Sequence, residues 1–140
     1  MNALLEPLSA HSRVRSADAD EARVRVGEVF CPHGLEPVTR SSALRVCFNS
    51  VNYGGVGLNY LDYGAAVRIR PQELRTFVLV QIPLAGRALV RSGGHEIHSD
   101  RGTASVPDPD APLDMRWQAG NPQLIVRIDR VALEWQLRRL

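Results

Sequence analysis

The chain has 140 residues, of which 44% are hydrophobic and 23% charged, and its formal net charge is +2. This composition is typical of a single globular domain and excludes a disordered or fibrous chain. The basic residues are spread among acidic ones along the sequence, which therefore shows no basic stripe of the kind that binds nucleic-acid phosphates.

Residues 1–17 have no sustained hydrophobic period, and we predict a flexible amino-terminal arm there. The arm lacks the apolar stretch and cleavage pattern of a signal peptide, and no stretch of the chain approaches the roughly 20 apolar residues that span a bilayer. Cys31 and Cys47 have no metal-ligand spacing and are expected to be free thiols. These features predict a cytoplasmic protein without membrane contact.

A helix is predicted to begin after Asp18, which can cap it, and to end before Pro32. Ala22, Val26 and Phe30 recur on one face of this helix. The short alternation at 23–26 also fits a strand, so both structures remain open for that stretch.

From Leu44 onward the pattern changes to short strands separated by glycine and proline turns. Strands are predicted in RVCFNSVNY, VGLNYLDY, AVRIR, LDMRWQ and QLIVRID, and a hairpin around Gly93–Gly94. RTFVLVQIPLAG is apolar on both faces, which predicts a strand buried between two layers, and TASV is expected to form a short strand. Many short strands of this kind predict a mainly β protein, an antiparallel barrel or sandwich.

The sequence ends in a second predicted helix, in which Asp129 is the expected cap. Its apolar stripe consists of Leu133, Leu137 and Leu140, at spacing i, i+4 and i+7. We interpret this stripe as a dimerisation surface.

An interior pocket is predicted from strand alternation, because barrel mouths are common sites for small ligands. Gln81 is informative, since a polar side chain on an inward face needs a partner. These side chains can also simply fill the core. The candidate ligand-binding residues are Tyr60, Phe77, Leu79, Gln81, Met115 and Trp117.

The runs GGVGLNYLDYGAAVRIRPQELRTFVLVQIPLAGRALVRSGG, DRGTASVPDPDAPLDMRW and QLIVRIDRVALEWQLRRL, in this order, resemble the AraC-binding-like domain of AraC/XylS-type bacterial regulators. The resemblance covers about residues 18–140. It implies a degenerate cupin-like, jelly-roll-like barrel that binds a small effector, with dimerisation helices starting at about residue 129. It also implies a homodimer whose DNA contacts come from a carboxy-terminal helix-turn-helix domain, which we expect to be absent from this chain.

Effector binding is expected to reshape the barrel mouth, together with the arm at 1–17, and to change how the helix from Asp129 packs. Small aromatic acids, amines and aldehydes remain open as effectors. No cofactor is predicted.

Two alternatives to this sensing role are a metal-dependent cupin enzyme and a ligand-free dimerisation or antagonist module. His95 and His98 are three residues apart, so on a strand they point to opposite faces and cannot share an ion. His33 follows the predicted helix and is expected to cap it or to pack at the surface. No nucleophile motif or phosphate-binding glycine loop occurs, and we predict neither catalytic nor metal-binding residues.

Overall fold

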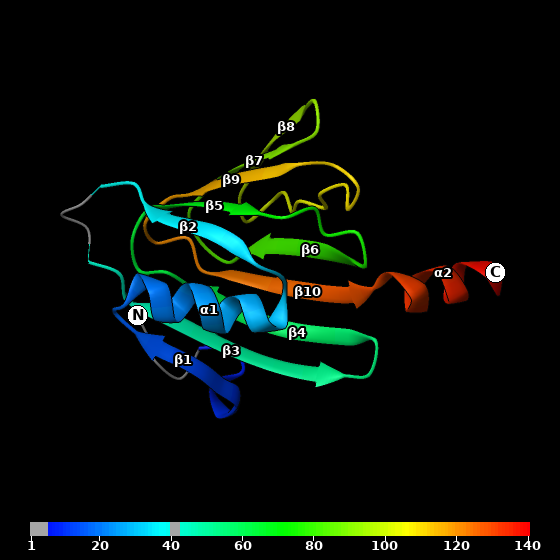
Figure 1. Ribbon diagram of the computed structural model, residues 1–140, viewed down its shortest axis with the longest axis horizontal. Helices are drawn as coiled ribbons and strands as arrows, with labels where there is room; N and C mark the ends of the chain where they lie inside the picture. Colours follow the sequence, from blue (N-terminus) through cyan, green and yellow to red (C-terminus); the bar gives the residue numbers. More distant parts are fainter. Residues whose placement is uncertain (1–5, 40–42) are drawn as a thin grey trace.

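The computed structural model describes residues 6–39 and 43–140 as two antiparallel sheets packed face to face, with one helix at the edge between them and another at the carboxyl end (Figure 1). Sheet A has the strand order β1-β3-β4-β10-β6, and sheet B has the order β2-β5-β9-β7-β8. The strands of sheet A are β1 (Ser12–Ser16), β3 (Val46–Tyr53), β4 (Val56–Asp62), β10 (Gln123–Asp129) and β6 (Phe77–Pro83). Those of sheet B are β2 (His33–Pro37), β5 (Val67–Pro71), β9 (Leu113–Trp117), β7 (Ala88–Ser92) and β8 (His95–Ser99).

The predicted strands after Leu44 are confirmed, with one exception. Val106 is exposed, and the TASV segment forms only isolated bridges, one between Thr103 and Asp100 and one between Ser105 and Gln81. In the second bridge the backbones of Gln81 and Ser105 exchange two hydrogen bonds of 2.9 and 3.0 Å. This bridge ties the segment to the edge strand β6 and helps to close the sandwich on that side.

The prediction of a flexible arm over residues 1–17 is wrong for its second half. Ser12–Ser16 forms β1, which pairs with β3 after a short 3-10 turn at Ser9–His11. Glu6 ties the start of this segment to the sheet, because its carboxylate accepts hydrogen bonds from Arg15 at 2.7 Å and from Asn49 Nδ2 at 3.1 Å. Residues 1–5 lie outside the described part.

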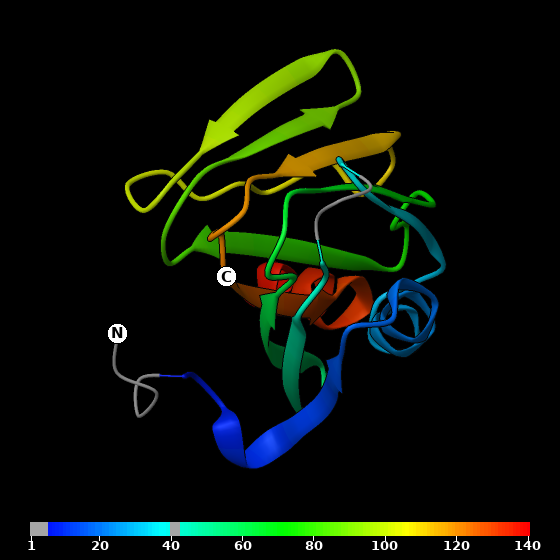
Figure 2. The ribbon, with the colours of Figure 1, turned by 90° about the vertical axis from the view of Figure 1, so that its left-hand side faces the viewer.

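Helix α1 (Ala19–Val29) lies at one edge of the sandwich, between β1 and β2 (Figure 2). Its predicted cap is confirmed, because Asp18 Oδ1 accepts hydrogen bonds from the backbone N–H groups of Asp20 and Glu21. Ala22 and Val26 are buried on its inner face. The helix therefore covers the gap that the two sheets leave open on this side.

Helix α2 (Arg130–Arg138) extends beyond the sheets, and none of its residues is buried (Figure 1). The predicted cap at Asp129 is not made by its side chain, since that carboxylate pairs with Arg127 instead. The backbone holds the helix start, as Asp129 N–H donates to Gly55 O at 2.8 Å. This arrangement fixes the first turn of α2 to sheet A and leaves the rest exposed.

A buried polar network decides which face of sheet A is internal. Asn59 is fully buried, accepts a hydrogen bond from Ser50 Oγ at 2.7 Å and donates to Ile125 O at 3.1 Å. Since side chains alternate along a strand, the apolar residues beside Asn59 and Ile125 face outward. That half-buried outer surface includes Leu58, Tyr60, Val78, Val80, Ile82, Leu124, Val126 and Ile128.

The expectation that β6 is buried on both faces is therefore wrong. Its inward residues Phe77, Leu79 and Gln81 are at most 5% exposed, whereas Val78, Val80 and Ile82 are only half-buried. No layer of the described residues covers the outer side of sheet A at these positions.

Candidate functional site

A small cavity lies between the two sheets beneath the carboxyl end of α1. Its volume is about 40 Å³, room for only a few water molecules, since one water needs roughly 10–15 Å³. The lining is contributed by both sheets, by α1 and by the loop before β6. The lining residues are Val26, Phe30, Cys31, His33, Leu61, Tyr63, Ile69, Pro71, Leu74, Leu79, Gln81, Met115, Trp117 and Ile125.

Four of the predicted ligand-binding residues lie together at this cavity: Leu79, Gln81, Met115 and Trp117. Gln81 is 1% exposed, and its Nε2 lies 3.4 Å from Ser105 Oγ, a long hydrogen bond. Trp117 contacts the edge of the Tyr63 ring, with 5.5 Å between ring centroids. Alternation in β6 and β9 was therefore sufficient to place these side chains inside, and ligand binding by them stays a prediction.

Tyr60 does not line the cavity, so its predicted place in the pocket is wrong. It lies half-buried on the outer face of sheet A, because its neighbour Asn59 occupies the interior. Partial burial, reinforced by the negative charge of Asp62, raises the pKa of Tyr60 to about 12. The phenol is therefore neutral at physiological pH.

Phe77 is buried but lies outside the cavity lining. The guanidinium carbon of Arg127 lies 4.4 Å from the centre of the Phe77 ring, a cation–π contact. Phe77 thus packs against the charged side chain of Arg127, near the point where sheet A meets α2. It does not line the predicted pocket.

The cavity side chains that the sequence analysis missed come from α1, from the start of β2, from β4, β5 and β10, and from the loop before β6. Val26 and Phe30 lie on the predicted apolar face of α1, and this face could have identified them as the cover of the pocket. His33 was expected to cap the helix or to lie at the surface. Instead it is half-buried, begins β2 and lines the cavity.

The described lining is uncharged at neutral pH. Burial, the largest contribution, lowers the pKa of His33 below its ordinary value of 6.5, and burial also raises the pKa of the Cys31 thiol. No arginine, aspartate or glutamate belongs to the described lining. The cavity is therefore suited to an apolar guest.

The other histidine pair lies away from this cavity, on the edge strand β8. His95 and His98 are both exposed. They lie three residues apart on β8, so their side chains point to opposite faces of the strand. Among residues 6–39 and 43–140, no three His, Cys, Asp or Glu side chains are grouped so that they could hold a metal ion.

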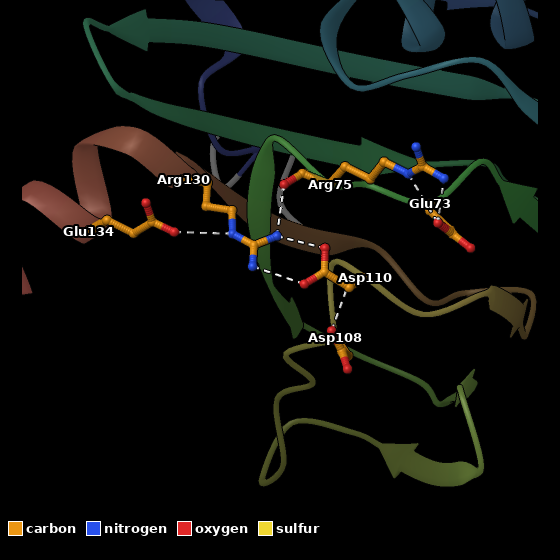
Figure 3. Close-up of polar contacts among 6 residues, drawn as sticks. All are labelled: Glu73, Arg75, Asp108, Asp110, Arg130 and Glu134. Atoms are coloured by element: carbon orange, nitrogen blue, oxygen red, sulfur yellow. Dashed lines mark hydrogen bonds and ion pairs between the residues drawn. The ribbon is translucent and has the colours of Figure 1, made fainter.

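Arg130, the first residue of α2, joins this helix to two loops of the sandwich (Figure 3). Its Nη1 and Nη2 atoms donate to the two carboxylate oxygens of Asp110 at 2.7 and 2.9 Å, and Nη1 also donates to Arg75 O at 3.0 Å. Its backbone N–H donates to Thr76 O at 2.9 Å. The loop between β5 and β6 therefore holds the start of α2 through two carbonyl groups.

This same loop carries a wall of the cavity. Leu74 is 3% exposed and lines the cavity, and the next residue, Arg75, has a left-handed φ of 54°, which is strained for a side chain of this size. Thr76 N–H closes the turn by donating to Leu74 O at 2.6 Å. A displacement of Leu74 would therefore act directly on the carbonyl groups that hold Arg130.

The contact between Asp110 and Arg130 is expected to depend on pH. Hydrogen bonding to Arg130 holds the pKa of Asp110 below its ordinary value of 3.8, so the contact stabilises α2 above that pH and is lost as the pH falls through the lowered pKa. In an NMR titration, the Arg130 amide shift should follow this acid transition, and in Asp110→Asn the transition should disappear. An unchanged transition in the variant would assign the effect to another carboxylate, such as Glu134.

The predicted dimerisation residues lie on the exposed part of α2 and just after it. Leu137 is 58% exposed, Leu140 follows the helix and is fully exposed, and Leu133 is half-buried. A groove separates α2 from the outer face of sheet A, with an apolar lining that includes Val56, Ile128, Leu133 and Trp135. Apolar surface thus continues from the helix onto the sheet.

Comparison with known protein families finds one matching model, that of the AraC-binding-like domain, over residues 22–140. A probable thc operon regulatory protein of Rhodococcus erythropolis is 32% identical over 125 residues, which cover 87% of this chain and 38% of that protein. The XylDLEGF operon transcriptional activator 1 of Pseudomonas putida is 30% identical over 82 residues, covering 59% of this chain and 26% of the activator. The chain therefore spans well under half the length of these relatives.

Solved structures confirm the cupin-like fold. The AraC-like transcriptional activator CuxR superposes with a TM-score of 0.69 at 10% identity, over 85% of this chain and 45% of CuxR. The cupin domain of Cnp3 from Schizosaccharomyces pombe superposes with a TM-score of 0.53 at 11% identity, over 71% of this chain and 77% of that domain. None of the described helices is long and apolar enough to span a membrane.

Proposed function

Since the chain belongs to the family of AraC-binding-like domains, we propose that it is the small-molecule sensing domain of a bacterial transcriptional regulator. The observation that carries this proposal is that Leu74 has two roles: it lines the cavity, and it begins the turn that holds Arg130 of α2. An effector between the sheets would in this way change the position of the carboxy-terminal helix.

The small size of the cavity requires movement on binding. A volume of about 40 Å³ is well below the roughly 150 Å³ that accommodates benzene in an engineered protein cavity. The side chains of Leu74 and Phe30 must move outward to admit a ligand. The effector therefore binds the open arrangement more tightly than the closed one, and this difference in affinity drives the change at α2.

The second copy of a homodimer is proposed to bind along α2. Leu133, Leu137 and Leu140 form an apolar stripe, and the adjoining groove against sheet A extends that surface. A shift of the first turn of α2 would then reorient the two copies relative to each other. DNA contacts are assigned to a carboxy-terminal domain outside these 140 residues, and the protein is accordingly placed in the cytoplasm.

A non-enzymatic role is supported by the relatives, which are named as an operon regulatory protein and a transcriptional activator. A metal-dependent cupin enzyme is the competing function, and the same purified protein tests it. Stoichiometric iron, zinc or manganese bound to the protein would favour the enzyme.

The sensing function is tested by a thermal-shift screen of small metabolites against the chain and its Leu79→Phe variant. An effector at a concentration of 100 Kd should stabilise the wild-type protein by about 2.7 kcal/mol. The larger side chain of Leu79→Phe should fill the cavity and weaken binding by tenfold or more. Leu58→Phe, on the outer face of the same sheet, is the matched control and should bind like the wild type.

The proposal fails if no metabolite in the screen stabilises the chain. It also fails if Leu79→Phe binds every stabilising compound as tightly as Leu58→Phe does, because the bound compounds would then lie outside the cavity.

A further inference from the structure

A groove opens on the surface at the edge of sheet B that is formed by β9, β7 and β8 (Figure 1). Its volume is about 630 Å³, within the roughly 300–1,000 Å³ of small-molecule sites. Polar and apolar atoms both contribute to its surface, whereas the surface of the cavity between the sheets is almost wholly apolar. This sheet B groove, whose lining includes Arg87, Leu89, His98, Asp100 and Arg116, is therefore suited to a guest with a polar group and an apolar body.

Two arginines bring positive charge to the sheet B groove. Met115 and Trp117 are buried, so Arg116 between them points away from the interior of the sandwich. Arg116 pairs with Leu89 of β7 in register, and Arg87 stands two residues before Leu89 and lines the same groove. Diagonal neighbours of this kind are within reach of long side chains. A single anion in the groove can therefore contact both guanidinium groups.

Arg116 has no ion-pair partner within the described chain. It lies directly opposite Arg68 of β5, and like charges in this arrangement repel each other. Arg68 is compensated, because it donates two hydrogen bonds to Asp114, at 3.1 and 2.6 Å. Neither Arg87 nor Arg116 forms an ion pair with a described Asp or Glu, and the rest of the sequence contains neither residue type. Two uncompensated arginines in one groove favour the binding of an anion.

The charge and the apolar part of the lining specify this anion. With histidine counted as neutral, Arg87, Arg116 and Asp100 contribute two positive charges and one negative charge, which leaves a net charge of +1. A single negative charge balances this lining, whereas a dianion would place excess charge beside the carboxylate of Asp100. Val38 is 58% exposed, and together with the half-buried Leu89 it offers apolar surface that a hydrocarbon chain can cover.

We infer that the sheet B groove binds an organic monocarboxylate, whose carboxylate lies between Arg87 and Arg116 and whose hydrocarbon chain covers Leu89 and Val38. Guanidinium groups match the planar geometry of a carboxylate and can donate two parallel hydrogen bonds to it. The site is separate from the cavity proposed for the effector. It gives the domain a second ligand of opposite character, charged and bound at the surface.

An NMR titration of the 140-residue chain at neutral pH tests this assignment, with the amide shifts of β7 and β9 as the readout. The probes are hexanoate, hexanamide, which has the same chain without the charge, and acetate, which has the charge without the chain. Hexanoate should bind at least about tenfold more tightly than acetate, because each buried methylene group contributes to the affinity. It should bind at least about fivefold more tightly than hexanamide, because charge-assisted hydrogen bonds are stronger than neutral ones.

Substitutions assign the charged residues of the site. Arg116→Gln should weaken hexanoate binding by about fivefold or more. Arg91→Gln is the matched control, because Arg91 lies on β7 outside the groove lining, pairs with Glu96 and changes the net charge equally when replaced. Asp100→Asn should tighten binding by about twofold or more, because it removes the negative charge but keeps the oxygen that accepts a hydrogen bond from Gly102 N–H. A loss of structure would weaken binding and not tighten it.

Absence of hexanoate binding, or equal binding of hexanoate and hexanamide, overturns the inference. An equal loss in Arg116→Gln and Arg91→Gln, or unaltered or weaker binding in Asp100→Asn, overturns it as well. Hexanoate binding should persist in Leu79→Phe, and its loss there would place the probe in the cavity between the sheets and contradict the groove. The metabolite screen tests the sensing function by itself, so either proposal can fail while the other stands.

Discussion

Replacing Phe48 with alanine is expected to lower the free energy of unfolding by about 3–5 kcal/mol, the largest effect of any single substitution considered for this chain. Phe48 is fully buried on β3, and its ring lies 5.9 Å from that of Phe30, at the end of α1. The substitution removes the contact between the Phe48 and Phe30 rings, which holds the end of α1 over the cavity. It also leaves a void that the rigid strands cannot fill. The free energy of unfolding of a small domain is only about 5–15 kcal/mol, so the substitution removes a large fraction of the stability of the protein.

Urea unfolding followed by circular dichroism measures this loss. Phe48→Leu is the control, because it keeps most of the volume and should cost clearly less than the alanine variant. If Phe48→Ala loses under 1 kcal/mol, the core around α1 can collapse and Phe48 does not fix the helix.

Replacing Gly86 with alanine is expected to destabilise the protein by about 3 kcal/mol. Gly86 has a φ of 68°, which costs a residue with a side chain roughly 1–2 kcal/mol. A Cβ at this position would also lie 2.6 Å from Gly120 O and 3.1 Å from Asn121 Cα, and both are backbone atoms that cannot turn aside. Overpacking of this kind adds roughly 1–3 kcal/mol.

Gly120 provides a matched control for Gly86. Its φ of 69° is nearly the same, but a Cβ there would meet no atom within 4 Å. Gly120→Ala should therefore cost only the conformational part, about 1–2 kcal/mol. The difference in unfolding free energy between the two variants isolates the close approach of the β6–β7 and β9–β10 loops, and equal costs would contradict it.

The sequence predicted the strands between Val46 and Asp129 because their hydrophobic period of two is regular and their turns are marked by glycine and proline. It did not predict β1 and β2, since each has a single buried apolar residue, Val14 and Leu35 respectively. Such edge strands are defined by their pairing with β3 and β5, which is a tertiary interaction.

The sequence also did not show which face of sheet A points into the interior of the sandwich. Both faces of β4 and β10 carry large apolar residues, so alternation groups Leu58 with Tyr60 but does not say which group is internal. The buried hydrogen bonds of Asn59 decide it, and these depend on Ser50 and Ile125 from neighbouring strands. His33 was missed for a similar reason, because its role depends on the cavity beneath α1.

The pairing of β1 with β3 has a practical consequence for any shortened form of the protein. A fragment that starts at Ala22, where the family match begins, would retain β3 without its neighbour, from Val46 to Asn49. An uncovered strand edge recruits strands from other molecules, so such a fragment is expected to self-assemble into insoluble β-rich material. Truncations intended to preserve the native state should therefore keep Glu6, which anchors this segment to Asn49.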